Sequence, residues 1–467
     1  MYRAKTDAFI EEKREDYFTD LSRLVAIDSS CGAKEDGYPY GRGPANALEA
    51  ALSRAESLGL YTENWENYLG IVQFWPGEER QLDILAHLDV VSAGEGWTKT
   101  EPFVMKEEDG RVYGRGTSDD KGPALAALYA MAAVKAAGVS LQHNARLVLG
   151  CDEERGSSDL EYYFSRTDFA PMSFSPDARY PIVNTEKGLF SVKGRGNAEE
   201  VAYPGIVKLD GGTAGNVVPD RCEARIRGLT AAAIAAAAQH TEEITGIHFE
   251  VKEVGAENVE ILAKGVSAHG SEPQKGNNVN TAMLELLHAL PLAASPVQKW
   301  IETLHGCFPH GDYYGEKAGI CVEDQISGQL TISLNMLRSN GKMLQFVVDG
   351  RVPMAAEEER LTKLAEILNA SGLACQTSFS PPHHVPEESP LIGTLLQCYE
   401  MYTGKRGYCY AVGSGTYVHN IPGGVAFGCV PEDMDTNMHG PDEFADSEAL
   451  IMSSKLFASV LIELCGH

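Results

Sequence analysis

The chain has 467 residues, of which 43% are hydrophobic, so it is long enough for two domains with ordinary cores. Its formal net charge of −27 argues against a nucleic-acid partner, because nucleic acid must be met by clustered lysine and arginine. No apolar run approaches the roughly 18 to 20 residues of a membrane span, and residues 1–13 carry mixed charge where a secretory signal would be apolar. We therefore expect a soluble, cytoplasmic protein with no membrane partner.

The ten cysteines are scattered along the chain and form no Cys-x-x-Cys pair. This spacing fits reduced thiols better than a disulfide framework or a thiolate zinc site. Cys151 stands out, because it precedes the acidic run 152–154.

Strands and helices alternate through the first part of the chain. Apolar residues at helical spacing predict one amphipathic helix over 6–27, and a second helix begins near Pro44 and ends at Gly59. The other expected elements are strands at 61–65, 70–75, 82–86 and 146–150 and an alanine-rich helix at 124–137.

The pattern changes at about residue 185, where glycines crowd together and alternating segments appear. Here we expect helices at 230–240, 279–290 and 355–369, and strands at 217–226, 248–253, 259–263, 330–336, 344–348 and 374–379. The closing part has helices at 390–402 and 447–464, a glycine loop at 413–417 and a strand at 424–428. These elements predict an α/β domain formed by 1–184 and 384–467, with an α+β domain inserted at 185–383.

Polar side chains follow the buried strand 82–86, where His87 and Asp89 stand at its carboxyl end. In an open α/β sheet this end faces the crevice where ligands bind. A period of two places both residues on the same face, so that the Asp89 carboxylate can reach one imidazole nitrogen and leave the other for a metal ion.

Other acids and a histidine follow further strands and loops. The candidate metal ligands are His87, Asp119, Glu154, Asp177 and His439. Imidazole and carboxylate without thiolate suit zinc, manganese or cobalt, and an aspartate between two ions can bridge them. Two ions about 3.5 to 4 Å apart would activate a shared water, and Glu153 would then serve as general base.

Each of these residues also has an ordinary structural interpretation. Asp119 and Asp120 precede the alanine-rich helix, where acids commonly cap a helix start. A lone His87 at a strand end is more often structural than a ligand, and Glu153 with Glu154 reads as a solvated acidic pair. Spacing alone leaves the metal site and these alternatives open.

Five motifs in order carry a resemblance to a known family. They are His87-Leu88-Asp89-Val90-Val91, Gly116-Thr117-Ser118-Asp119-Asp120-Lys121-Gly122, Asp152-Glu153-Glu154, Ser175-Pro176-Asp177 and Met438-His439-Gly440. Together they resemble the co-catalytic metallopeptidases that include aminoacylase, carboxypeptidase G and carnosinase, and most of all their PepV-type dipeptidases. The resemblance covers essentially the whole chain.

The resemblance implies a role for each ligand candidate. Asp119 would bridge two divalent ions, zinc in first place and manganese or cobalt as alternatives. His87 and Asp177 would complete one site, and Glu154 and His439 the other. It further implies that Asp89 orients His87, that Glu153 is the general base and then the proton donor to the leaving amine, and that the peptide bond between Asp119 and Asp120 is cis.

The resemblance also implies that the inserted domain is a lid on a zinc-peptidase-like catalytic domain. His269 in Val266-Ser267-Ala268-His269-Gly270 would stabilise the oxyanion, and Asn216 would contact the substrate. Arg351 would clamp the substrate carboxylate with its planar fork, together with backbone N–H groups of the loop Gly413, Ser414, Gly415 and Thr416. A surface-loop histidine and a structural salt bridge remain the alternatives for His269 and Arg351.

The expected function is hydrolysis of unblocked dipeptides by a monomer, since the long lid of PepV-type relatives is thought to imitate the partner in smaller, dimeric ones. A deacylase for N-acyl amino acids on the same site is the nearest rival. A peptide-binding protein with a decayed site is a second rival, and retention of Glu153 and all five ligand candidates argues against it. A two-metal phosphoesterase would need a basic cluster that the chain lacks.

Overall fold

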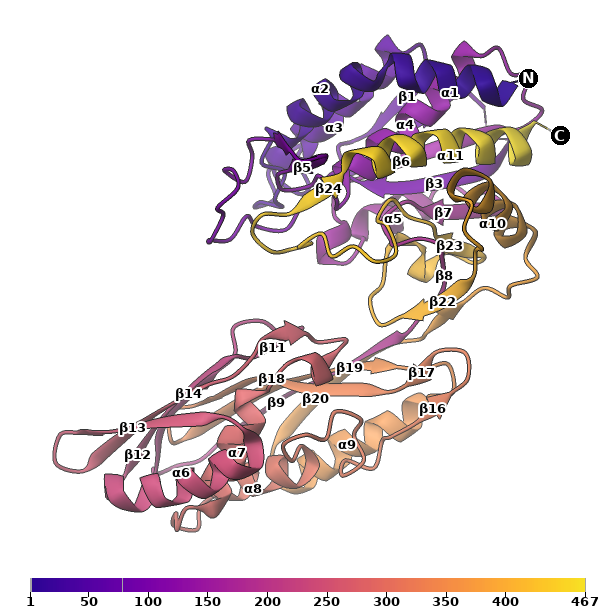
Figure 1. Ribbon diagram of the computed structural model, residues 1–467. Coiled ribbons are helices and arrows are strands. Elements are labelled where there is room, and N and C mark those ends of the chain that lie inside the picture. Colours follow the sequence, from indigo (N-terminus) through magenta and orange to yellow (C-terminus); the bar gives the residue numbers. More distant parts are fainter. Residues whose placement is uncertain (1, 78, 467) are drawn as a thin grey trace. The chain divides into compact units, whose positions relative to one another are not determined.

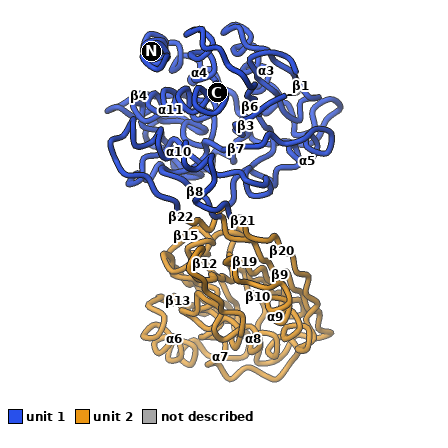
Figure 2. The backbone as a smooth tube through the Cα atoms, turned by 90° about the vertical axis from the view of Figure 1, so that its right-hand side faces the viewer, with its two compact units in different colours: residues 1–185, 384–410, 415–467 blue, residues 186–383, 411–414 orange. Residues whose placement is uncertain are grey.

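The computed structural model describes residues 2–77 and 79–466, which form two compact units (Figure 2). Unit 1 contains residues 1–185, 384–410 and 415–467, and unit 2 contains residues 186–383 and 411–414. The short segment 411–414 thus groups with unit 2, although it lies beyond the predicted end of the inserted domain. No helix in the described ranges has the length and apolar character needed to span a membrane.

Unit 1 is built on a nine-stranded sheet in the order β1-β2-β6-β3-β7-β23-β8-β21, with β22 beside β8. Its centre is parallel, because β3 pairs in parallel with both β6 and β7, and β7 with β23. The strands are β1 (Tyr61–Trp65), β2 (Leu69–Gln73), β3 (Arg80–His87), β6 (Asn144–Gly150), β7 (Met172–Ser175), β8 (Ile182–Glu186), β21 (His383–His384), β22 (Cys409–Val412) and β23 (Gly424–Ala426).

Apolar helices bury this sheet. α4 (Lys121–Ala136) is buried along almost its whole length and packs with α11 (Ser447–Cys465) against β3 and β6 (Figure 1). A helix that is apolar all round belongs in a core, which is why the alanine-rich run lies here. The other unit 1 elements are α1 (Tyr2–Glu12), α2 (Arg14–Val25), α3 (Arg42–Ser57), α5 (Ser158–Phe164), α10 (Pro390–Thr403), and the small sheet of β4 (Lys106–Glu108), β5 (Arg111–Tyr113) and β24 (Phe444–Asp446).

Unit 2 is an eight-stranded antiparallel sheet in the order β13-β14-β12-β10-β18-β19-β9-β20, and its helices lie on one face (Figure 1). Its strands alternate between buried and exposed residues, as expected where only one face is covered. The strands are β9 (Gly188–Asn197), β10 (Gly205–Gly211), β12 (Arg221–Arg227), β13 (His248–Val254), β14 (Asn258–Lys264), β18 (Thr331–Ser339), β19 (Met343–Val352) and β20 (Ala374–Ser380). The helices are α6 (Ala231–Thr245), α7 (Val279–Ala289), α8 (Pro296–Cys307) and α9 (Glu358–Ala370).

Three helical regions differ from the sequence-based expectation, and one of them is the short helix α5, which was not predicted. The single helix predicted over 6–27 is wrong, because the chain bends at Lys13 between α1 and α2. The bend lets α1 contact both α4 and α11 while α2 contacts α4 and α3. Helix α8 is missing from the prediction, although Ser295 caps its first turn through the N–H of Gln298, 3.1 Å away, and Pro296 begins it.

Gly150, the last residue of β6, gives a first test of this packing. A Cβ atom added there would lie 1.8 Å from the hydroxyl of Tyr417 and 2.5 Å from a carboxylate oxygen of Asp159. Overpacking of a close-packed interior typically costs about 1–3 kcal/mol, so we expect Gly150→Ala to lower the free energy of unfolding by about 2 kcal/mol. Urea denaturation followed by circular dichroism measures this change.

Gly393, inside helix α10, provides the matched control, because an added Cβ meets no atom within 4 Å. There the same substitution should stabilise the protein by roughly 0.5–1 kcal/mol, since alanine is the better helix former. Equal stability of the two alanine variants would contradict the packing described around Gly150.

Candidate active site

Three parallel strands end together and bring polar side chains to one edge of the unit 1 sheet. His87 is the last residue of β3, and Asp177 follows β7 by two residues. Glu153 and Glu154 form a short 3₁₀ turn just after β6. Because β3 lies between β6 and β7, these carboxyl ends are neighbours, as the strand-end argument predicts.

Asp119 links two groups of potential metal ligands. One of its carboxylate oxygens lies 3.0 Å from Nε2 of His87, which is itself 3.7 Å from Asp177. Its other oxygen lies 2.9 Å from Nε2 of His439, which is 3.3 Å from Glu154. Within each group of three, the possible ligand atoms are all within 4.8 Å of one another. The structure thus gathers all five ligand candidates around Asp119, and the expected cis bond between Asp119 and Asp120 is present.

The chemistry of the donor atoms fits a pair of cations. Nε2 of His87, Oδ1 of Asp119 and Oε1 of Glu154 are buried, and none has a hydrogen-bond partner among the described residues. A buried polar atom without a partner costs about 1–3 kcal/mol, so native proteins rarely keep several at one place. Metal ions coordinated by these atoms would remove that cost.

The raised pKa values of the carboxyl groups show that burial and mutual repulsion disfavour their ionised forms. Burial, and then the nearby Asp119, raise the pKa of Glu154 to about 7 and raise that of Asp177. Burial and neighbouring carboxylates also raise the pKa of Glu153 well above its usual range. Burial opposes protonation of His439, but Asp119 and Glu154 outweigh it and raise the pKa of this histidine to about 11. The edge therefore holds an excess of negative charge that divalent ions would balance.

Asp89 organises the site through the backbone more than through His87. Its two carboxylate oxygens accept the N–H groups of Glu153 and Glu154, at 3.2 and 3.1 Å. Nδ1 of His87 lies 3.0 Å from the backbone carbonyl of Asp89 and 3.4 Å from its carboxylate. A carbonyl only accepts, so Nδ1 carries the proton and Nε2 keeps its lone pair for an ion.

A buried ion pair connects the loops that carry Asp119 and His439. Oε1 of Glu443 accepts the N–H groups of Gly116, Ser118 and Asp119 at 3.0, 3.0 and 3.2 Å. Its Oε2 accepts a 2.6 Å bond from Arg115, whose guanidinium also donates to the carbonyls of His439 and Gly440. This network holds Asp119 and the backbone of His439 in fixed relative positions.

Most of the predicted substrate-binding residues cluster within unit 2. The short strands β11 (Val217–Val218) and β15 (Ala268–His269) pair, which places His269 opposite Val217 and beside the exposed Asn216. Nδ1 of His269 lies 2.6 Å from the Ser271 hydroxyl. A Cβ on Gly413 would lie 2.8 Å from Cβ of Ser271 and 3.5 Å from Cγ of Arg351.

Arg351 forms a salt bridge, and the glycine loop is divided between the two units. The guanidinium of Arg351 pairs with Asp349 at 3.2 Å, which is the salt bridge that the sequence left open, but its buried Nε has no hydrogen-bond partner among the described residues. Ser414 belongs to unit 2 with Gly413, whereas Gly415 and Thr416 belong to unit 1. Thr416 caps a 3₁₀ turn at Tyr417–Asn420.

Comparisons with known proteins show the family of this chain. The family described as "Peptidase family M20/M25/M40" matches residues 84–463. The chain belongs to this family. The Beta-Ala-Xaa dipeptidase of Lactobacillus delbrueckii subsp. lactis is 36% identical over 465 residues, which cover 97% of each chain. The family resemblance expected from the five motifs is confirmed, and the chain is a peptidase, a hydrolase of peptide bonds.

Solved structures of two other dipeptidases share the fold. Human carnosine dipeptidase 1 superposes with a TM-score of 0.60 at 15% identity, over 99% of each chain. The dipeptidase Dug1p from Saccharomyces cerevisiae also has a TM-score of 0.60, at 12% identity over 98% of each chain. The expected fold class, an α/β catalytic part with a second α+β part, is therefore confirmed.

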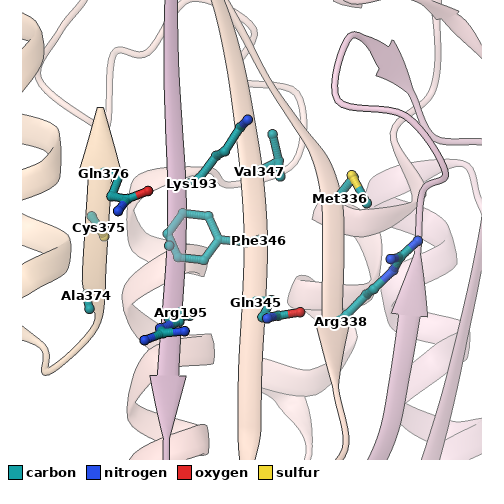
Figure 3. Close-up of a pocket in the computed structure, with 11 residues that line it drawn as sticks. Lys193, Arg195, Met336, Arg338, Gln345, Phe346, Val347, Ala374, Cys375 and Gln376 are labelled. Carbon is teal, nitrogen blue, oxygen red and sulfur yellow. The ribbon is translucent and has the colours of Figure 1, made fainter. Parts of the chain in front are cut away.

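A groove of about 600 Å³ elsewhere in this M20 peptidase contains none of the predicted site residues (Figure 3). It lies on unit 2, over strands β9, β18, β19 and β20, and includes the exposed residues Lys193, Arg195 and Arg338. Arg338 already pairs with Asp210 at 3.2 Å. This groove is therefore not the candidate active site, in spite of its volume.

Sequence reasoning missed three residues that support the site. Glu443 follows His439 by four residues, and its partner Arg115 directly precedes the motif that begins at Gly116. Tyr417 donates a 2.5 Å bond to Asp159, which also accepts the N–H groups of Cys151 and Asp152 just before Glu153. An acid four residues after His439 and an acid in a segment with no predicted element are weak signals, because both are also common on surfaces.

The Glu443 network predicts a large effect from a small change. In Glu443→Gln the shape is kept, but Arg115 loses its charged partner in the interior. Breaking a buried pair costs about 3–5 kcal/mol, so we expect the free energy of unfolding to fall by about 3 kcal/mol and zinc affinity to fall with it. Chemical denaturation and zinc titration of metal-free protein measure the two effects.

The control is Glu448→Gln, which removes an acid that pairs with Arg14 at the surface and is 76% exposed. An exposed ion pair contributes roughly 0–1 kcal/mol, so this variant should resemble the wild type. If Glu443→Gln were as stable and as tightly metal-binding as Glu448→Gln, the network would have no positioning role.

Proposed function

We propose that this chain is a metal-dependent dipeptidase that hydrolyses unblocked dipeptides, with Glu153 as general base. The observation that carries the proposal is the shared position of Asp119 between two three-residue ligand groups, His87 with Asp177 and Glu154 with His439. The Beta-Ala-Xaa dipeptidase name of the 36% identical relative supports the choice of dipeptides.

Two divalent ions held by the five ligands supply the polarisation of a carbonyl and the activation of a water. The ligand set of imidazole and carboxylate favours zinc, with manganese and cobalt as alternatives. Glu153 begins the 3₁₀ turn three residues after the end of β6, and its backbone N–H is held by Asp89, so it lies next to the ligand Glu154. It takes the proton from the water and passes it to the leaving amine.

We assign substrate recognition to the unit 2 cluster, which acts as the lid of a monomeric enzyme. His269 supplies an N–H to the oxyanion, and Asn216 beside it contacts the substrate. Arg351, close to Gly413 and with its Nε unused within the described structure, reads the carboxyl end of the dipeptide. The backbone N–H groups of the loop Gly413, Ser414, Gly415 and Thr416 assist it.

Hydrolysis assays on chelator-stripped protein test this function. With zinc, manganese or cobalt restored, free dipeptides should be cleaved and their N-acetylated forms should not. Glu153→Gln should lower kcat by about 10²–10⁴-fold, the usual contribution of a general base, while metal binding is retained. Glu161→Gln, an exposed acid on the neighbouring α5, should behave as wild type.

Other outcomes of these assays have distinct meanings. Cleavage of the acetylated substrates alone would replace the dipeptidase with a deacylase on the same site. Inactivity with all three metals would replace catalysis with peptide binding by a decayed site.

Arg351→Lys tests the recognition of the carboxyl end. Lysine keeps the charge but not the planar fork, so KM for a free dipeptide should rise roughly 10- to 100-fold, the value of a hydrogen bond between charged groups, with a smaller change in kcat. For the same dipeptide with an amidated carboxyl end, the variant and wild type should have equal kcat/KM.

The amidated substrate distinguishes recognition from structure. An equal loss on both substrates would mean that Arg351 only supports Asp349, its partner in the salt bridge. Arg338→Lys is the matched control, because Arg338 is an exposed arginine of the same sheet that pairs with Asp210.

A further inference from the structure

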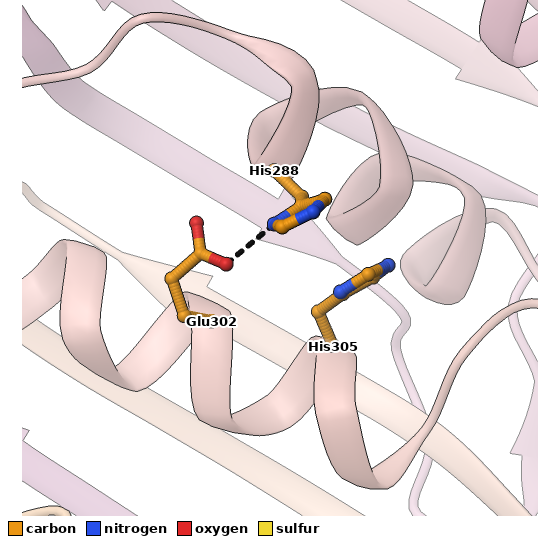
Figure 4. A group of neighbouring side chains, drawn as sticks. All are labelled: His288, Glu302 and His305. Carbon is orange, nitrogen blue, oxygen red and sulfur yellow. Dashed lines mark hydrogen bonds and ion pairs between the residues drawn. The ribbon is translucent and has the colours of Figure 1, made fainter.

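Two helices of unit 2 carry the same four-residue pattern on facing sides. Helix α7 contains Glu285-Leu286-Leu287-His288, and helix α8 contains Glu302-Thr303-Leu304-His305. Residues three apart on a helix lie on one face, so each helix presents a glutamate and a histidine together. The two helices pack against each other, and Figure 4 shows His288, Glu302 and His305 meeting between them.

The four side chains pair across the helices. Nδ1 of His288 lies 2.5 Å from Oε2 of Glu302 (Figure 4). Nε2 of His305 lies 2.9 Å from Oε2 of Glu285. The two imidazole rings stack, with centroids 4.2 Å apart and planes inclined by 16°. Each histidine therefore contacts the glutamate of the other helix and the face of the other histidine.

This arrangement has the composition of a metal site. One ligand atom from each of His288, Glu302 and His305 lies within 4.8 Å of the other two. Imidazole with carboxylate suits zinc and neighbouring divalent transition ions.

Glu285 fits the supporting role that such sites use. Its Oε2 accepts from His305, and its Oε1 accepts the backbone N–H of His310 at 3.1 Å. A carboxylate held in this way fixes the orientation of a ligating histidine. Gln298 holds Oε1 of Glu302 at 2.7 Å, which leaves Oε2 on the side of His288. The charges also match, since a divalent ion balances the two glutamates.

We propose that His288, Glu302 and His305 bind one divalent transition-metal ion of the zinc type, with Glu285 orienting His305. The site is separate from the ligand set around Asp119 and goes beyond the dipeptidase function. Its side chains are accessible to solvent, with His288 50%, Glu302 38% and His305 19% exposed. The ion joins α7 to α8 and stabilises unit 2, and this stabilisation rises with the logarithm of the free zinc concentration once that exceeds the dissociation constant.

The test counts ions bound to the full-length chain. In an Asp119→Ala background, which disables the shared active-site ligand, stripped protein is equilibrated with zinc and its metal content is measured by atomic absorption. We expect His288→Ala with His305→Ala to bind one zinc fewer than its parent. The matched control, His240→Ala with His248→Ala, removes two exposed unit 2 histidines that also lie near glutamates, at 3.8 and 2.8 Å, and should lose none.

A second double variant separates the loss of the metal site from a loss of the fold. His288→Gln with His305→Gln keeps hydrogen-bonding groups and should also lose one zinc, with an unchanged circular dichroism spectrum. Zinc should raise the melting temperature of the Asp119→Ala parent more than that of this variant. Equal zinc content in the parent and the glutamine variant would overturn the proposal, whatever the dipeptidase assays show.

Discussion

The concentration of carboxylates at one edge of a parallel sheet is the constraint on which the rest of unit 1 depends. Asp119, Glu154 and Asp177 lie together with Glu153, and burial makes their mutual repulsion expensive. Such a cluster persists in a folded protein only where positive charge reaches it. Two divalent ions bound to this cluster would supply that charge.

The protein holds this cluster in place mainly through backbone groups. Asp89 accepts the N–H groups of Glu153 and Glu154, and Glu443 accepts three N–H groups of the loop that ends at Asp119. A backbone held at several points cannot relax away when like charges repel. Holding the backbone in this way requires two further acids, Asp89 and Glu443, to be buried. The charge of Glu443 is neutralised by Arg115.

The sequence predicts those parts of the structure that depend on local pattern. Apolar runs predicted the parallel strands β3 and β6, and His87 and Glu154 were found because they stand at or just after the ends of these strands. Helix α4 lies where the dense run of alanine predicted a helix. The bend at Lys13 has no proline or glycine signal, since it results from packing against α4 and α11. Glu443 was missed for a similar reason, because a single acid in a loop reveals its role only when the fold brings it to Arg115.

The unit 2 cluster shows how pairing brings distant residues together. Strand β15 places His269 opposite Val217, and the turn that follows places Ser271 against Gly413, some 140 residues further on. Asp349 sits inside this cluster, and burial raises its pKa to about 6 although Arg351 opposes the rise. With this pKa the carboxyl is still largely ionised at neutral pH, and it pairs with Arg351 at 3.2 Å. The buried Nε of Arg351 makes no hydrogen bond within the described residues, so the guanidinium keeps a donor for a second carboxylate, as the proposed recognition of a free peptide end requires.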